Sequence, residues 1–214
     1  MSTSELLSLR ESRRADREAR KRTDAIAAAS AVFATKGYHD AQMTEIAAAA
    51  ELSRASLYAM FAGKQELYEA VIETTASEMG DAVRGAVAAL DDPGEKLLCV
   101  IDSLFACYDE NQALLRIYAL GTHGLPFKIR DAMGDSTLQR FVEFTDWVVE
   151  LSQQASRAGY LSGLDPEAIG VSLVGTVTTT AVRWIESRPE CSLSQAAPTV
   201  RAIFQRLIGE KEAA

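Results

Sequence analysis

The sequence predicts an all-α fold in which a small N-terminal helical domain precedes a larger helical bundle. Apolar residues recur three and four positions apart along nearly the whole chain, and no segment alternates apolar and polar residues as a strand would. Turn-forming residues interrupt the periodic segments, most clearly at 91–94 (DDPG) and 124–126 (GLP). With 48% apolar and 24% charged residues, the 214-residue chain has the composition of a globular protein with a sizeable core.

Residues 43–64, MTEIAAAAELSRASLYAMFAGK, predict two short helices with a tight break between them. Ser53 is a good N-cap for a second helix that begins at Arg54. Leu57 and Phe61 lie four positions apart on that helix, so both can face the core. The surface left over carries mostly small or polar side chains: Arg54, Ala55, Ser56, Tyr58 and Ala59. A helix with a slim exposed start can enter the major groove of DNA, although a helical hairpin that binds nothing has the same pattern.

The segments on both sides of this hairpin are also expected to be helical. Thr23 is expected to cap a helix that stops at Gly37. A long helix is expected over 64–90, and the DDPG turn ends it. This helix begins in the first domain and ends in the second, so it is the natural mechanical link between them. Further helices are expected at 95–109, 112–123, 126–133, 136–158, 165–187 and 193–208.

From about Thr23 to Glu73 the chain resembles the DNA-binding domain of the TetR/AcrR family of bacterial transcriptional regulators. The resemblance needs no gaps and covers about a quarter of the chain. The shared residues, in the family's order and spacing, are Ala31 to Tyr38 (AVFATKGY), Glu45-Ile46-Ala47, Leu52-Ser53-Arg54, Leu57-Tyr58, Phe61 and Lys64 through Leu67 (KQEL).

Three positions depart from the family pattern. Gln42 stands where the family usually has Thr, at the cap of the first hairpin helix. Glu51 takes a turn position that is usually Gly, where a left-handed backbone costs a residue with a Cβ about 1 kcal/mol. Met60 stands where the family often has His or Tyr in contact with the DNA backbone.

The resemblance implies a homodimeric transcriptional regulator that binds a palindromic operator in double-stranded DNA. It further implies a repressor that a small, largely apolar effector releases, with a transcriptional activator of the same fold as the alternative. The two recognition helices of such a dimer would reach half-sites about 34–36 Å apart. The implied base contacts are Arg54, Ala55 and Ser56, and the implied phosphate contacts or neighbours are Thr44, Tyr58 and Lys64.

Charge is distributed unevenly along the chain, whose net charge is −8. Residues 1–64 hold ten Lys/Arg and eight Asp/Glu, whereas residues 65–214 hold twelve and twenty-two. The acidity therefore belongs to the part that need not approach DNA. We expect a basic arm at 1–22, a helix-turn-helix domain at 23–68 and a ligand-binding and dimerisation domain at 69–214.

The basic arm is open to two interpretations. It is either a flexible segment that follows DNA phosphates or enters a flanking minor groove, or a solvated tail. Its cations are Arg10, Arg13, Arg14, Arg17, Arg20, Lys21 and Arg22.

Aromatic and aliphatic side chains gather in the predicted bundle. They are either ordinary core or the lining of a pocket for an apolar small molecule, with a few polar groups that orient it. The pocket candidates are Leu104, Tyr108, Arg116, Tyr118, His123, Phe144 and Trp147.

The last two expected helices are the candidate dimer interface. The first carries small residues that allow close packing, and the second carries an apolar stripe unsuited to water. Packing within one chain is the alternative, whereas in TetR-like proteins the corresponding helices form a four-helix interface. The dimer candidates are Gly170, Val174, Gly175, Val200, Phe204 and Leu207.

The sequence contains no Gly-rich phosphate loop, GxSxG, HExxH or clustered Cys and His, so we expect neither an enzyme nor a metal or cofactor site. Three cysteines without CxxC spacing indicate free thiols. We expect a cytoplasmic protein with no membrane partner, because no run of 18 apolar residues and no secretory segment occurs. The rival function is a helical homodimer whose hairpin binds other proteins and binds DNA only weakly.

Overall fold

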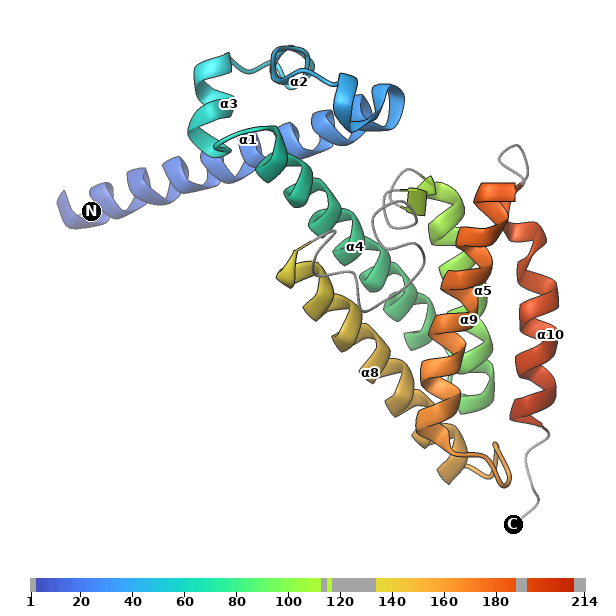
Figure 1. Ribbon diagram of the computed structural model, residues 1–214. Coiled ribbons are helices and arrows are strands. Elements are labelled where there is room, and N and C mark those ends of the chain that lie inside the picture. Colours follow the sequence, from blue (N-terminus) through green and yellow to red (C-terminus); the bar gives the residue numbers. More distant parts are fainter. Residues whose placement is uncertain (1–2, 113–114, 117–133, 188–191, 210–214) are drawn as a thin grey trace. The chain divides into compact units, whose positions relative to one another are not determined.

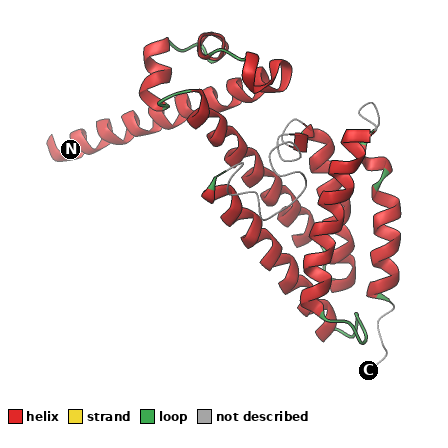
Figure 2. Cartoon of the chain, in the orientation of Figure 1, coloured by secondary structure: helices red, strands yellow, loops and turns green. Residues whose placement is uncertain are grey.

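The computed structural model describes residues 3–112, 115–116, 134–187 and 192–209, and every regular element among them is helical (Figure 2). This confirms the all-α prediction. The helices expected at 126–133 and over most of 112–123 lie outside the described residues, together with Tyr118 and His123. The chain forms two compact units, residues 1–74 and 75–214, and α4 (Lys64–Ala88) runs from the first into the second. The domain boundary expected at 68/69 stays a prediction.

The N-terminal unit contains α1 (Thr3–Asp40), α2 (Met43–Ala49), α3 (Arg54–Met60) and the first turns of α4 (Figure 1). The expected cap at Thr23 is wrong, because α1 is already helical from Thr3 and the Thr23 hydroxyl donates to the Ala19 carbonyl at 3.2 Å. Gly37 does interrupt the helix, with a φ of 76°. The core of the unit consists of Ala25, Ala29, Phe33, Ala41, Met43, Ile46, Ala47, Leu57, Phe61, Leu67 and Val71.

The turn between α2 and α3 has the left-handed residue that the sequence predicts. Glu51 has a φ of 55° and is exposed. The Leu52 amide donates to the Ala47 carbonyl at 2.8 Å and the Glu51 amide to the Ala48 carbonyl at 3.1 Å, which is the Schellman pattern of a helix end. The turn thus satisfies the last carbonyls of α2 and sets the direction in which α3 starts.

The C-terminal unit contains the rest of α4, α5 (Pro93–Glu110), α8 (Asp135–Arg157), α9 (Pro166–Ser187), the 3-10 turn η2 (Leu193–Gln195) and α10 (Ala197–Ile208). Helices α8 and α9 pack closely, and Gly170 lies directly against the Val149 backbone. Asp92 caps α5 by accepting the Glu95 amide at 2.9 Å. Asp109, at the other end of α5, accepts the Leu193 amide at 2.9 Å and so fixes η2.

By length and composition alone, helix α9 is apolar enough to cross a membrane. Half of its most apolar 18-residue segment is buried inside the fold. Its buried side chains include Ile169, Leu173, Val177 and Ala181, which repeat at four-residue intervals. This periodicity is that of a helix with one face in a protein core.

Candidate functional site

Helix α3 is held by its apolar face and displays its first turn. Leu57 and Phe61 are almost fully buried, and the Ser53 side chain accepts the Ser56 amide at 3.0 Å, as the sequence predicts. Arg54 and Ala55 are exposed, and the Tyr58 side chain is 45% exposed. The N-terminal end of α3 therefore offers one cation, one small side chain and one aromatic hydroxyl to a nucleic acid.

Two of the candidate DNA contacts are partly engaged inside the domain. The Ser56 hydroxyl lies 2.8 Å from the Ser53 hydroxyl, and Ser56 is half-buried. The Thr44 hydroxyl lies 3.5 Å from the Gln42 side-chain oxygen. A hydroxyl can still accept a second hydrogen bond, so Thr44 and Ser56 both remain candidates for DNA contacts. The contact between the Ser56 and Ser53 hydroxyls limits the orientation in which the Ser56 hydroxyl could bind DNA.

Arg22 orients the C-terminal end of α3, a role that the sequence did not predict. Its guanidinium donates to the Met60 carbonyl at 2.9 Å and lies 4.2 Å from the centre of the Phe61 ring. The sequence analysis placed Arg22 in the basic arm. No local signal could have shown this contact, because Arg22 and Met60 are 38 positions apart.

Lys64, an implied phosphate contact or neighbour, is engaged by backbone carbonyls inside the domain. Its ammonium donates to the carbonyls of Tyr38, His39 and Ala41 at 2.7, 2.9 and 3.1 Å, and lies 4.6 Å from the Tyr38 ring centre. An ammonium has three N–H donors, so these carbonyls use all of them. Lys64 therefore ties the start of α4 to the end of α1.

Glu45 supports the start of α2 where Gln42 is an unusual cap. Its carboxylate accepts the Gln42 amide at 3.3 Å and the Lys36 ammonium at 2.6 Å. The hydrogen bond from Lys36 lowers the pKa of the Glu45 carboxyl. A carboxylate in the first turn is also favoured by the helix dipole.

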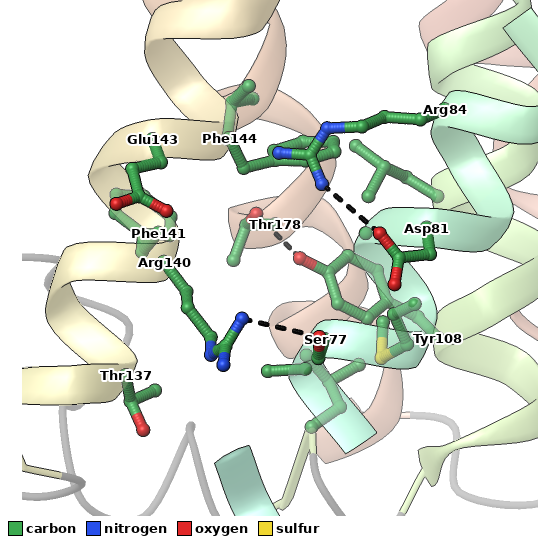
Figure 3. Close-up of a pocket in the computed structure, with 16 residues that line it drawn as sticks. Ser77, Asp81, Arg84, Tyr108, Thr137, Arg140, Phe141, Glu143, Phe144 and Thr178 are labelled. Carbon is green, nitrogen blue, oxygen red and sulfur yellow. Dashed lines mark hydrogen bonds and ion pairs between the residues drawn. The ribbon is translucent and has the colours of Figure 1, made fainter. Parts of the chain in front are cut away.

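A cavity of about 160 Å³ lies in the C-terminal unit between α4, α5, α8 and α9 (Figure 3). Its wall is mostly apolar, with Met79, Leu104, Leu115, Phe144 and Val174 among the lining residues. The polar lining residues are Ser77, Asp81, Arg84, Tyr108, Thr137, Arg140, Glu143 and Thr178. An apolar wall with a few convergent polar groups is typical of small-molecule sites.

Six polar residues of the cavity form three separate pairs (Figure 3). Arg140 donates to the Ser77 hydroxyl at 3.2 Å, and Arg84 lies 3.7 Å from the Asp81 carboxylate and 5.7 Å from the Phe144 ring centre. Elsewhere the hydroxyls of Tyr108 and Thr178 are 3.0 Å apart. The two guanidinium groups come from different helices, α8 and α4, and the lining also carries the carboxylates of Asp81 and Glu143.

Thr137 is a third polar feature of this wall. Its hydroxyl is buried and has no hydrogen-bond partner in the part of the chain that the structure describes. A buried hydroxyl without a partner costs about 1–3 kcal/mol, which a ligand's polar group could offset.

The cavity brings together Leu104, Tyr108 and Phe144 of the seven pocket candidates. Trp147 lies outside the lining and packs on Phe144, with ring centres 5.4 Å apart. Arg116 is exposed and also outside it. Sequence analysis missed Arg84 and Arg140, because exposed arginines on amphipathic helices give the same pattern as an ordinary solvated face.

The dimer candidates divide between the interior of the chain and its surface. Gly170, Val174, Val200 and Phe204 are buried within the unit, so packing inside one chain explains them. A Cβ at Gly170 would lie 2.7 Å from the Val149 Cα, whereas nothing lies within 4 Å of one at Gly175. Gly175 and the exposed Leu207 remain candidates for a dimer contact, and the surface adds Val171 and Ile203, which are 51% and 46% exposed.

The helix-turn-helix region matches a known family model. Residues 25–71 fit the model described as bacterial regulatory proteins of the tetR family. The N-terminal domain belongs to the TetR family. The match covers α2, α3 and the parts of α1 and α4 that pack on them, and so confirms the family resemblance of the sequence.

A curated protein resembles this chain over a limited stretch. The HTH-type transcriptional activator FasR of Mycolicibacterium smegmatis is 36% identical over 85 residues. This stretch is 40% of the present chain and 39% of that relative, so the chain matches about two fifths of the relative's length.

Solved structures share the whole TetR-type fold at low identity. The fatty acid degradation regulator FadR of Bacillus halodurans has a TM-score of 0.70 at 20% identity, over 86% of this chain and 94% of that one. The transcriptional regulator FadR of Bacillus subtilis, solved in complex with stearoyl-CoA, has a TM-score of 0.66 at 19% identity, over 87% and 99%. The ketosteroid regulator KstR2 of Mycobacterium tuberculosis has a TM-score of 0.64 at 20% identity, over 88% and 95%. At these identities the likeness concerns the fold alone.

Proposed function

We propose that this protein is a homodimeric transcriptional repressor that leaves a palindromic operator when a small effector binds its C-terminal unit. The observation that carries the DNA-binding part is the exposed first turn of α3, held by buried Leu57 and Phe61 inside the matched domain. The rival, a hairpin that binds other proteins, would predict no sequence selectivity. The activator alternative is supported by the similarity to FasR, a transcriptional activator by name, and a reporter gene downstream of the operator distinguishes repression from activation.

The effector class follows from the chemistry of the cavity. Its apolar wall suits a hydrophobic body, and the guanidinium groups of Arg84 and Arg140 suit an anionic or strongly polar head. One structural neighbour was solved with stearoyl-CoA and another is named a ketosteroid regulator, which agrees with an apolar effector. We therefore infer an amphipathic ligand, with a long-chain acyl-CoA as the first probe.

Binding of a long ligand supplies a mechanism for release. A cavity of about 160 Å³ is close to the roughly 150 Å³ engineered cavity that holds one benzene molecule. A long acyl chain exceeds this volume, so we expect the surrounding helices to move apart when it binds. Helix α4 lines the cavity with Ala76 and Arg84 and also begins at Lys64 in the N-terminal unit. A shift of α4 would change the separation of the two recognition helices, and a coupling of about 1–3 kcal/mol suffices for regulation.

The proposed dimer surface lies on α9 and α10. Val171 and Gly175 are one turn apart on α9, and Ile203 and Leu207 are one turn apart on α10. All four are at least partly exposed, and the gap over Gly175 allows the close approach of another helix. We expect this surface to pair with a second copy across a two-fold axis.

Arg54→Ala should relax base preference at one position of each half-site. Arginine commonly reads guanine by two hydrogen bonds in the major groove, and loss of such a pair costs about 1–3 kcal/mol of discrimination. The measurement is selection of bound sequences from random duplex DNA at about 0.15 M salt, compared for the two proteins. Arg157→Ala, which removes an exposed cation from the C-terminal unit, should leave the selected sequence unchanged. Absence of any enriched palindrome with the unsubstituted protein would favour the rival function.

Ala76→Trp should abolish the response to the effector and leave operator binding intact. The added ring would occupy the cavity from the α4 side, where Ala76 lines it. Stearoyl-CoA is titrated into a fluorescent operator complex, and we expect the half-release concentration to rise at least about tenfold, or 1.4 kcal/mol. Ala82→Trp is the matched control, because Ala82 lies on the same helix but is exposed and outside the lining. Equal responses of the Ala76→Trp variant and the unsubstituted protein would show that this cavity is not the effector site.

A further inference from the structure

The first half of α1 carries a basic stripe on one face. The stripe consists of Arg10, Arg13, Arg14, Arg17, Arg20 and Lys21, all of which are exposed. At 100° per residue these six side chains fall within an arc of roughly 120°, and the acidic residues Glu11, Asp16 and Glu18 fall outside it. Because α1 is helical from Thr3, the segment for which the sequence left a flexible DNA-binding arm or a solvated tail open forms a regular helix.

The stripe takes no part in the core of the N-terminal unit. The buried side chains of α1, Ala25, Ala29 and Phe33, point roughly 120° away from the centre of the stripe. Within the described chain, the side chains of Arg10, Arg13 and Arg14 have no hydrogen bond or ion pair, whereas Lys21 pairs with Glu18 at 3.2 Å. Folding therefore does not explain this concentration of positive charge.

The stripe begins where the recognition helix ends. Arg22, the next residue after it, donates to the Met60 carbonyl of α3. From that point α1 continues beyond α3 toward the N-terminus (Figure 1). The distance along the helix axis from Lys21 to Arg10 is about 17 Å, which corresponds to about five base pairs of duplex.

We propose that the basic stripe binds the phosphate backbone of the duplex next to each operator half-site. This inference rests on the proposed function, because α3 must first bind DNA in the same unit. Charge complementarity identifies the occupant: six cations on one face match the regular anionic surface of a duplex. Between Arg10 and Lys21 the opposite face offers only Ser12, Ala15 and Ala19, so this segment lacks the large apolar side chains that a membrane-binding helix would bury. The stripe adds affinity without reading bases.

The test combines a protein variant with two lengths of DNA. Arg10→Gln/Arg14→Gln removes two stripe cations, and Lys96→Gln/Arg157→Gln removes the same charge from the C-terminal unit. Each protein is titrated with the selected operator, either trimmed to its half-sites or extended by about ten base pairs at each end, over a range of salt concentrations. Circular dichroism melts of the variants confirm that they fold.

We expect the stripe variant to bind the extended operator about tenfold more weakly at 0.1 M salt, with a salt slope smaller by about 1–2. On the trimmed operator the variant and the unsubstituted protein should be equal, and the control pair should match the unsubstituted protein throughout. A wild-type salt slope on the extended operator, or an equal loss on both lengths, would overturn the proposal. Neither of these two results would affect the proposed function, because the unsubstituted protein would still bind its operator selectively. If the unsubstituted protein showed no selective operator binding, the proposed function would be overturned together with the stripe.

Discussion

Lys64→Met should lower the free energy of unfolding of the protein by about 2–3 kcal/mol and leave the salt dependence of operator binding unchanged. The substitution keeps most of the side-chain stem and removes the ammonium that binds the carbonyls of Tyr38, His39 and Ala41. Hydrogen bonds from a charged group contribute about 1.5–3 kcal/mol each, and water can replace part of this where the carbonyls are exposed. Urea unfolding followed by circular dichroism gives the stability, and operator titrations over a range of salt give the slope.

Lys36→Met is the matched control for this experiment. Lys36 is an exposed lysine of the same unit whose ammonium pairs with Glu45 at 2.6 Å, and surface pairs of this kind contribute little to stability. A Lys64→Met protein with wild-type stability and a salt slope smaller by about 1 would contradict the structural role. That result would restore the phosphate contact expected from the family resemblance.

Gly170→Ala should destabilise the C-terminal unit by about 1–3 kcal/mol, although alanine is ordinarily the better helix former. The new Cβ would lie 2.7 Å from the Cα and 3.0 Å from the backbone nitrogen of Val149 on α8. Backbone atoms cannot rotate away as a flexible side chain can, so α8 and α9 must separate. Urea unfolding measures the loss.

Gly85→Ala is the control, and we expect it to raise the free energy of unfolding where Gly170→Ala lowers it. Gly85 lies inside α4, and a Cβ there has no neighbour within 4 Å, so we expect a gain of up to about 1 kcal/mol in the free energy of unfolding.

Sedimentation of the Gly170→Ala protein shows whether the substitution acts on packing within one chain or on the dimer. Wild-type unfolding together with a dissociated dimer would return Gly170 to the dimer interface, where the sequence analysis placed it.

Local signals in the sequence were sufficient for the helices and turns near the recognition helix. Ser53 caps α3, Gly37 interrupts α1 and Glu51 adopts a positive φ, each as predicted. These features depend on a few consecutive residues, whose backbone preferences act over one turn of helix. The family match over 25–71 has the same origin, because its motif is a set of such short-range features.

Long-range contacts could not be read in the same way. The resemblance implied a phosphate contact or neighbour at Lys64, and Arg22 belonged to the basic arm, which was either a DNA-binding segment or a solvated tail. The structure places Lys64 on three carbonyls 23–26 positions away and Arg22 on a carbonyl 38 positions away. A charged side chain in a sequence gives no information about which distant carbonyl will be near it.

The sequence by itself determined the fold class, the position of α3 and the family resemblance of the N-terminal domain, because periodicity, caps and turn residues act locally. Only the tertiary structure decided which side of each helix is covered. It buried Gly170 and Phe204, left Gly175 and Leu207 at the surface, and brought Arg84 and Arg140 to one cavity from different helices. The physical reason is that an amphipathic helix encodes an apolar face but not the neighbour that covers it.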